Sequence, residues 1–251
     1  DDVDLVSIVT PTNVHAEIAV AAAEAGKHIF SEKPLAMNVA QAKAMLAAVE
    51  KAGVLHMVGF NYRRVPAIAL AKRLIEEGLI GRIFHWRAAY LQDWIVDPNF
   101  PVNWKLKKEV AGSGPHGDLN AHIIDLARYL VGEVVSVVGM NATFIKQRPL
   151  EAEARELKTM LTAEAGQGME EVTVEDAAAF LAKFESGAVG TFEATRFATG
   201  RKNHERFEIY GSKGSLVFNL ERLNELEYYS REEPSHVQGW RKIMVTEESQ
   251  P

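Results

Sequence analysis

Strand patterns alternate with helix patterns in the first 61 residues, and this alternation constrains the fold more than any other feature of the sequence. The patterns fall at residues 5–9, 15–25, 28–30, 39–52 and 54–60, of which the second and fourth are helical. Strands joined by helices of this length run parallel, because parallel neighbours need a crossover connection. Residues 1–61 are therefore predicted to form the C-terminal half of a doubly wound parallel sheet.

The ends of the two predicted helices are marked by capping residues. Asn13 is the expected N-cap of the first helix, and Gly26 is its expected stop. Asn38 and Gln41 have the spacing of a capping box, and Gly53 follows the second helix. These residues predict where the crossover helices begin and end.

The pattern changes after residue 61. Helix patterns lie at 67–77 and 117–130, strand patterns lie at 83–91, 134–144, 180–184, 188–195, 206–210 and 215–219, and a polar, aromatic loop and an acidic segment lie at 92–109 and 150–171. Consecutive strands with short glycine-containing turns predict an antiparallel sheet. The fold class is thus α/β: an incomplete doubly wound (Rossmann) parallel sheet in residues 1–61, followed by an α+β domain with a largely antiparallel open sheet in residues 62–251.

Composition excludes several functional classes. The 251 residues include no cysteine, which excludes disulfides and thiolate metal sites and suits a cytoplasmic enzyme. The net charge is −6 and the basic residues are scattered, so a nucleic acid partner is not expected. No apolar run approaches the roughly 20 residues that cross a bilayer, so no membrane partner is expected either.

Asp118 and His122 are the first candidates for chemistry. They stand four residues apart in a predicted helix, so their side chains are expected on one helix face, with Asp125 near the same edge. Taken alone, the pair is also compatible with an ordinary hydrogen-bonding role or with metal binding. His116 is the only nearby candidate for a third ligand, and no metal site is predicted.

Lys33 follows the second predicted strand. Ligands of doubly wound folds bind beyond the carboxyl ends of the strands, so Lys33 is expected to point into the ligand crevice. A solvated lysine at the strand end is the alternative. Pro34 is compatible with a cis peptide bond, whose base rate before proline is about 5–6%.

Three side chains in the 92–109 loop suit a sugar. Gln92, Trp94 and Trp104 combine aromatic faces with hydrogen-bonding groups, which match the faces and hydroxyls of a sugar ring. Core packing is the alternative for either tryptophan.

Several short motifs occur in an order that resembles the Gfo/Idh/MocA oxidoreductases, and the resemblance covers essentially the whole chain. The motifs are Thr10-Pro11, Glu32-Lys33-Pro34-Leu35, Phe60-Asn61-Tyr62-Arg63, Gly81-Arg82-Ile83, Gly112-Ser113-Gly114 and Asp118-Leu119-Asn120-Ala121-His122. Within the family, the runs at 90–94 and 121–130 are most similar to members that oxidise anhydrosugars and inositols.

The resemblance implies roles for these residues. Lys33, Asp118 and His122 would be catalytic, with His122 as the general base and Lys33 stabilising the alkoxide. Gln92 and Trp94, with Asp118 and His122, would bind a cyclic sugar, anhydrosugar or polyol. The residues expected to bind the nicotinamide cofactor are Thr10, Pro11, Asn13, His15, Glu32, Lys33, Asn61 and Trp104. The cofactor would be NAD or NADP, with NAD favoured.

The chain begins at Asp1 and enters a strand pattern almost at once, so it is expected to be a fragment. About 60 residues, estimated as two strand-helix units, would carry the glycine-rich phosphate loop, and the fragment alone is expected to bind cofactor poorly and to be inactive. The sheet from residue 134 onward is expected to expose apolar residues on strands such as 188–195 and so to leave one face for a homodimer or homotetramer. A sugar sensor without turnover and an NAD-dependent glycosidase are the alternative functions.

Overall fold

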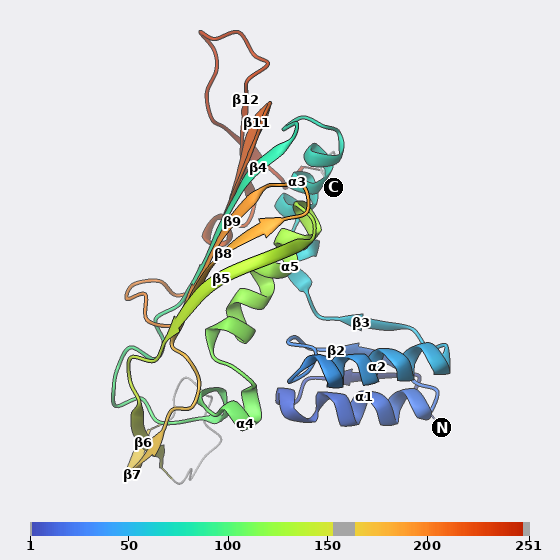
Figure 1. Ribbon diagram of the computed structural model, residues 1–251, viewed down its shortest axis with the longest axis vertical. Coiled ribbons are helices and arrows are strands. Elements are labelled where there is room, and N and C mark those ends of the chain that lie inside the picture. The colour runs from blue at the N-terminus through green and yellow to red at the C-terminus, as the bar shows by residue number, and fades with distance from the viewer. Residues whose placement is uncertain (1, 153–163, 248–251) are drawn as a thin grey trace. The chain divides into compact units, whose positions relative to one another are not determined.

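The computed structural model of the chain describes residues 2–152 and 164–247 (Figure 1). The chain forms two compact units and passes between them repeatedly. The first unit contains residues 1–60, 97–121 and 143–176, and the second contains 61–96, 122–142 and 177–251. Each unit is therefore assembled from segments that are distant in the sequence. The split into consecutive domains after residue 61 stays a prediction.

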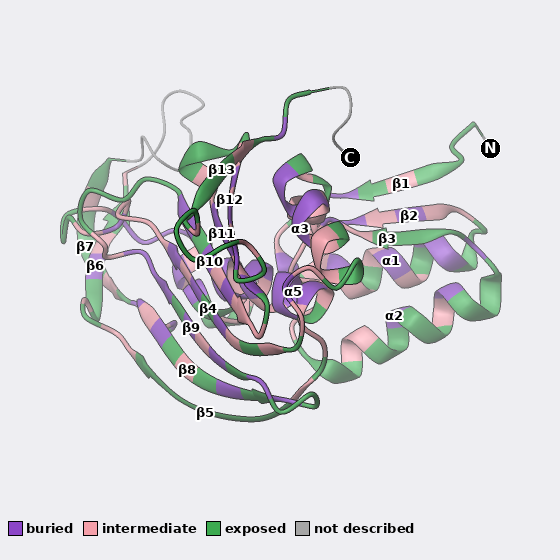
Figure 2. Cartoon of the chain, turned by 90° about the horizontal axis from the view of Figure 1, so that it is seen from above, coloured by how far each residue is buried: buried purple, intermediate pink, exposed green. Residues whose placement is uncertain are grey.

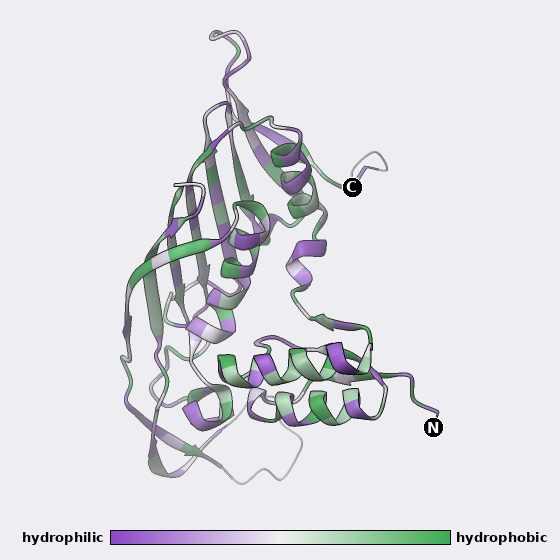
Figure 3. Ribbon diagram, turned by 45° about the vertical axis from the view of Figure 1, so that its right-hand side comes forward, coloured by the Kyte–Doolittle hydropathy of each residue, from purple (hydrophilic) through white to green (hydrophobic). Residues whose placement is uncertain are grey.

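The first unit contains the predicted parallel sheet. Its strands are β1 (Leu5–Ile8), β2 (His28–Ser31) and β3 (His56–Val58), paired in parallel in this order. Helices α1 (His15–Glu24) and α2 (Val39–Ala52) connect them, and their ribbons in Figure 3 carry mostly the green of apolar residues. Small alanines let the helices pack closely on the sheet. The buried core is Ile8, Ala19, Ala22, Ala23, Ile29, Met45, Val49 and Val54.

The two crossover helices begin differently. The N-cap predicted for α2 is confirmed, because Asn38 Oδ1 accepts a hydrogen bond from the backbone N–H of Gln41 at 3.0 Å. Gly53 ends this helix with a φ of 64°, in the left-handed region that favours glycine. The N-cap predicted for α1 is wrong. Asn13 lies inside a 3₁₀ turn, η1 (Thr12–Val14), and Val14 precedes α1 without a side-chain cap.

The rest of the first unit is built around a hairpin of β6 (Gln147–Glu151) and β7 (Ala165–Glu171). Both strands overlap the segment that the sequence marked only as acidic; its residues 153–163 lie outside the described residues. Fully buried Arg148 donates hydrogen bonds to the carbonyl oxygens of Asp97 and Phe100, at 2.8 and 3.2 Å. These bonds tie the long loop to the hairpin. The loop continues into η3 (Trp104–Leu106) and α4 (Lys108–Ala111).

The second unit contains the predicted open sheet, which has eight strands among the described residues. In spatial order they are β13 (Arg241–Met244), β12 (Glu225–Ser230), β11 (Gly214–Asn219), β10 (His204–Gly211), β4 (Ile83–Leu91), β9 (Val189–Thr195), β8 (Ala177–Phe184) and β5 (Val134–Ala142). All neighbours run antiparallel except β4 and β9, which run parallel. The expected largely antiparallel sheet is confirmed.

Helices cover one face of this sheet. They are η2 (Asn61–Arg64), α3 (Pro66–Glu76) and α5 (Ala121–Leu130), with a short η5 (Leu220–Arg222) in the β11–β12 connection. Fully buried Trp86 stacks on Phe207 on the covered face, with ring centroids 5.0 Å apart. The opposite, open face carries Val138, Met140, Leu181 and Val189, which are 50–74% exposed. Figure 2 shows that β5 is exposed along most of its length. The sheet thus has one buried face and one exposed face, and the apolar part of the exposed face lies mainly on β5 and β8.

Candidate active site

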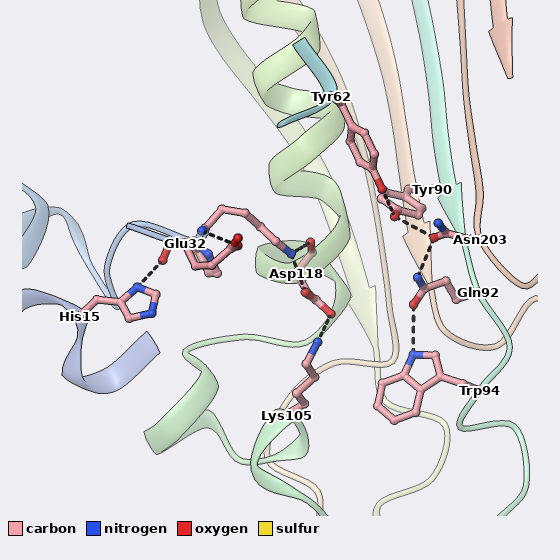
Figure 4. Close-up of polar contacts among 11 residues, drawn as sticks. His15, Glu32, Tyr62, Tyr90, Gln92, Trp94, Lys105, Asp118 and Asn203 are labelled. Atoms are coloured by element: carbon pink, nitrogen blue, oxygen red, sulfur yellow. Dashed lines mark hydrogen bonds and ion pairs between the residues drawn. The ribbon is translucent and has the colours of Figure 1, made fainter. Parts of the chain in front are cut away.

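Lys33 belongs to a half-buried ion pair in the first unit. It follows β2 and precedes a cis bond to Pro34. Its ammonium donates to Asp118 Oδ1 at 2.8 Å and to the Asp118 carbonyl oxygen at 2.9 Å (Figure 4). The two side chains are only 16% and 19% exposed. The alternative of a solvated lysine at the strand end is therefore wrong.

Asp118 lies in a π-helical turn, His116–Asn120, which leads directly into α5. The sequence predicted a regular helix here. The approach to the turn requires glycine at Gly114, because a Cβ there would overlap the backbone carbonyl of Glu175. Residues 112–117 have the G-x-G-x-x-G spacing, but they follow α4 rather than a strand, so they are not a dinucleotide fingerprint. Single π-helical turns occur often at functional sites.

A second lysine, Lys105, also binds Asp118, and the sequence did not single it out. Its ammonium donates to Asp118 Oδ2 at 3.2 Å, and its side chain is 23% exposed. The backbone of η3 is held by Asn103, whose Oδ1 accepts the Lys105 N–H at 3.0 Å. Each carboxylate oxygen of Asp118 therefore faces one ammonium group, and the three side chains carry a net charge of +1.

Most of the predicted cofactor residues of the first unit follow the carboxyl ends of β1 and β2. Thr10 and Asn13 are exposed, and Glu32 Oε2 accepts the Lys33 backbone N–H at 3.1 Å. Gly59 lacks a side chain where Glu32 approaches, since a Cβ there would lie 3.2 Å from Oε1. The exposed side chains here are uncharged, and Lys33 and Glu32 stand beside them at the strand end, where doubly wound folds bind their ligands.

His15, Trp104 and Asn61 were also predicted to bind the cofactor. His15 is 1% exposed, and its ring nitrogens lie 3.0 and 2.9 Å from the carbonyl oxygens of Pro34 and Thr10. It ties these two loops together, and burial leaves it little surface for a direct contact. Trp104 is 38% exposed in η3, and Asn61 is an exposed residue that begins η2 of the second unit.

His122 lies on α5 in the second unit, among aromatic rings. It is 7% exposed, and its ring centroid lies 4.6 Å from that of Tyr62 and 5.9 Å from that of Tyr90. Asp125, which the sequence placed near His122, forms a two-pronged ion pair with Arg63 at 2.7 and 2.5 Å. These hydrogen bonds raise the pKa of Arg63 above its usual value. They fix η2, and with it Tyr62, against α5.

A chain of hydrogen bonds brings the predicted substrate residues Gln92 and Trp94 together with three that the sequence missed (Figure 4). The hydroxyls of Tyr62 and Tyr90 lie 2.8 Å apart, and that of Tyr90 donates to Asn203 Oδ1 at 2.8 Å. Gln92 Nε2 donates to the same oxygen at 3.0 Å, and Trp94 Nε1 donates to Gln92 Oε1 at 3.1 Å. Tyr62 lies in one of the quoted motifs and Tyr90 in the strand pattern at 83–91, so the sequence indicated neither of them as part of this cluster.

The described residues contain no group of three or more His, Cys, Asp or Glu side chains that could hold a metal ion. Within the same ranges, no helix is both long and apolar enough to cross a membrane.

Comparison with known proteins identifies the family. Residues 68–217 match the family described as "GFO/IDH/MocA C-terminal domain", and residues 1–60 match "Oxidoreductase family, NAD-binding Rossmann fold". The chain belongs to the Gfo/Idh/MocA oxidoreductase family. The resemblance drawn from its motifs is thereby confirmed.

Among Gfo/Idh/MocA relatives, the chain is 49% identical to levoglucosan dehydrogenase of Pseudarthrobacter phenanthrenivorans over 96% of its own length and 62% of the relative's. It is 35% identical to scyllo-inositol 2-dehydrogenase (NAD(+)) of Bacillus subtilis, over 85% and 54% of the two lengths. A solved structure of levoglucosan dehydrogenase in complex with NADH is 48% identical, with a TM-score of 0.91 over the whole chain and 63% of that structure. The chain thus spans less than two thirds of these relatives.

Proposed function

We propose that the whole protein oxidises a secondary alcohol of a cyclic sugar, anhydrosugar or polyol and passes the hydride to NAD. The observation that carries the proposal is the half-buried cluster of Asp118 and Lys105 with Lys33, which follows the carboxyl end of β2. The names of the relatives, levoglucosan dehydrogenase and scyllo-inositol 2-dehydrogenase, support the reaction and the substrate class. The NADH complex of a relative supports NAD as the cofactor.

The first step is removal of the hydroxyl proton. We assign it to His122, whose imidazole, when neutral, accepts a proton, as general bases do in dehydrogenases working near neutral pH. Tyr62 and Tyr90 pack against this ring and hold its orientation. A bound nicotinamide would supply the acceptor for the hydride that leaves the same carbon.

Lys33 stabilises the negative charge that develops on the substrate oxygen. Asp118 positions this ammonium through two of its oxygens, at 2.8 and 2.9 Å. If the Asp118 carboxylate neutralised Lys33 completely, it would weaken this role of the lysine. Lys105 binds the same carboxylate, however, so the cluster keeps its net positive charge. Charge that is fixed before the reaction and shielded from water is effective in lowering a barrier.

The remaining predicted contacts divide between cofactor and substrate. Thr10, Pro11, Asn13, Glu32, Asn61 and Trp104 are proposed to contact the nicotinamide half of the cofactor, with His15 supporting the loops from behind. Gln92 and Trp94 are proposed to bind the substrate, because their hydrogen-bonded chain fixes polar groups beside aromatic faces.

The test uses the whole protein with NAD or NADP and a panel of anhydrosugars, inositols and aldoses. We expect NADH formation, and a fall of roughly 10²–10⁴ in kcat for Lys33→Met and for His122→Ala, the range typical of general acid–base catalysis. Lys108→Met, which changes an exposed lysine, is the matched control. Wild-type rates in both site variants would refute the assignment. Sugar release from a glycoside without net NADH, or binding without turnover, would favour the glycosidase or the sensor.

We also propose that the open face of the large sheet binds a second copy of the chain, giving a homodimer or homotetramer. The sequence placed the exposed apolar residues on strand 188–195, but Phe192 and Ala194 of β9 are buried. Exposure is instead highest on β5 and β8, where Val138, Met140 and Leu181 are 57–74% exposed beside a depression of about 750 Å³. Contiguous apolar surface of this kind commonly marks a subunit interface.

A cytoplasmic location is part of the same proposal. The absence of cysteine from the sequence supports it, since a cysteine-free chain needs no oxidising compartment to fold.

A further inference from the structure

In the hydrogen-bonded chain of the second unit, Trp94 determines which group donates and which group accepts in each bond. An indole N–H can only donate. Because Trp94 Nε1 lies 3.1 Å from the Gln92 amide, the oxygen end of that amide must face the indole. The nitrogen end of Gln92, which also only donates, then faces Asn203 at 3.0 Å.

The orientation of the Asn203 amide follows from its neighbours. The atom that faces Gln92 Nε2 must be the acceptor Oδ1, so the hydroxyl of Tyr90, at 2.8 Å from the same oxygen, donates to it. Tyr90 has no second hydrogen, so Tyr62 donates to Tyr90. Asn203 therefore turns its Nδ2, with two N–H donors, away from these partners. No described residue accepts a hydrogen bond from Nδ2, and the residue is exposed.

The backbone before Asn203 is pinned by Asp93. The carboxylate of Asp93 accepts hydrogen bonds from the Gly200 N–H at 2.9 Å and from the Lys202 ammonium at 2.8 and 3.0 Å. The Lys202 hydrogen bond holds the pKa of Asp93 below its usual value, so this carboxylate stays charged at neutral pH. Asn203 thus stands between a pinned loop and the start of β10, and its donors are presented at a fixed place.

We infer that Asn203 determines substrate specificity by donating hydrogen bonds from Nδ2 to an acceptor oxygen of the substrate. This inference rests on the proposed dehydrogenase function and narrows its substrate class. A hydroxyl held at Nδ2 needs a separate acceptor for its own hydrogen, and Asn203 Oδ1 already accepts two bonds. A ring or bridging ether oxygen accepts without donating, so it suits this position better. Asn203 therefore favours a sugar or anhydrosugar over an inositol, which has only hydroxyls.

The test compares levoglucosan, which has ether oxygens, with myo-inositol as substrates of the whole protein. Asn203→Asp keeps the shape of the side chain but replaces both donors with an acceptor. We expect the KM for levoglucosan to rise at least about tenfold, the equivalent of one well-placed hydrogen bond, with kcat changed by less than about threefold. The ratio of kcat/KM for levoglucosan to that for myo-inositol should fall.

Two further variants keep the test decisive. Asn224→Asp makes the same change of charge at an exposed residue outside the hydrogen-bonded chain and should leave both KM values unchanged. Asn203→Ala removes the donors without adding charge and should lower the same ratio of kcat/KM values. If both Asn203 variants keep the wild-type ratio of kcat/KM values, because the two substrates lose equally or not at all, the inference alone is overturned. A wild-type protein that oxidises no sugar or polyol would overturn the proposed function and this inference together.

Discussion

Replacing Glu205 by glutamine measures how much stability the second unit gives up by burying a carboxyl group. Glu205 lies on β10, opposite Tyr90 of β4 in the strand register, and it is fully buried. Neither carboxyl oxygen has a hydrogen-bond partner among the described residues. Burial raises the pKa of Glu205 from its usual 4.5 to about 8. The folded protein therefore holds a proton at neutral pH that the unfolded chain releases.

The size of the effect follows from this difference in pKa. Each pH unit between the two pKa values costs about 1.4 kcal/mol. Below pH 4.5 both states are protonated and the group costs nothing through ionisation. As the pH rises through this window, the free energy of unfolding falls, by about 3 kcal/mol at pH 7 and by about 5 kcal/mol once the pH exceeds 8.

Glutamine cannot ionise, so Glu205→Gln should escape this loss. We expect urea unfolding to show equal stability of the two proteins near pH 4.5 and a more stable variant at pH 7, with a Tm higher by roughly 6–12 °C. Glu193→Gln, at an exposed position of β9, is the control and should show no such difference. A stability difference that is the same at every pH, or a variant less stable at pH 8, would refute the reasoning.

Two other substitutions test the charge cluster and the open face. Lys105→Met should lower kcat by about 10²-fold, because it leaves Asp118 to neutralise Lys33. Lys105→Arg should restore most of the rate. If Lys105→Met forms NADH at the wild-type rate in stopped-flow measurements, the proposed role of Lys105 is contradicted. Met140→Asp, on a residue 74% exposed, should shift light scattering at micromolar concentration from the oligomer toward the monomer, and an unchanged mass would argue against this face as the interface.

Local sequence signals predicted the secondary structure where they act on the backbone directly. Helix α2 begins and ends as expected because Asn38 and Gly53 terminate it through their own conformations. The cap expected at Asn13 failed because a 3₁₀ turn precedes α1. The parallel pairing of β4 with β9 could not be predicted, since it joins segments about a hundred residues apart and no local pattern encodes it.

The candidate site shows the same limit. Lys33 and Asp118, both named from the sequence, form an ion pair across 85 residues of chain. Asn203 was missed because it meets Gln92 only through the pairing of β10 with β4, which brings residues 111 apart in the sequence together. Lys105 was missed because its role depends on a loop fixed by buried Arg148, and a lone lysine in a polar loop carries no signal. Contacts that depend on distant pairing need the fold itself.

The passage of the chain between the two units has a consequence for synthesis and for engineering. The chain passes between the two units at 60/61, 96/97, 121/122, 142/143 and 176/177. The parallel strands of residues 1–60 leave the ribosome before residues 61–176, and the first unit lacks its last segment until residue 176 has been made. At a translation rate of roughly 5–20 residues per second, the first unit stays incomplete for several seconds. Neither unit can be transplanted into another protein as one continuous insert, so grafting the first unit would require three separate segments.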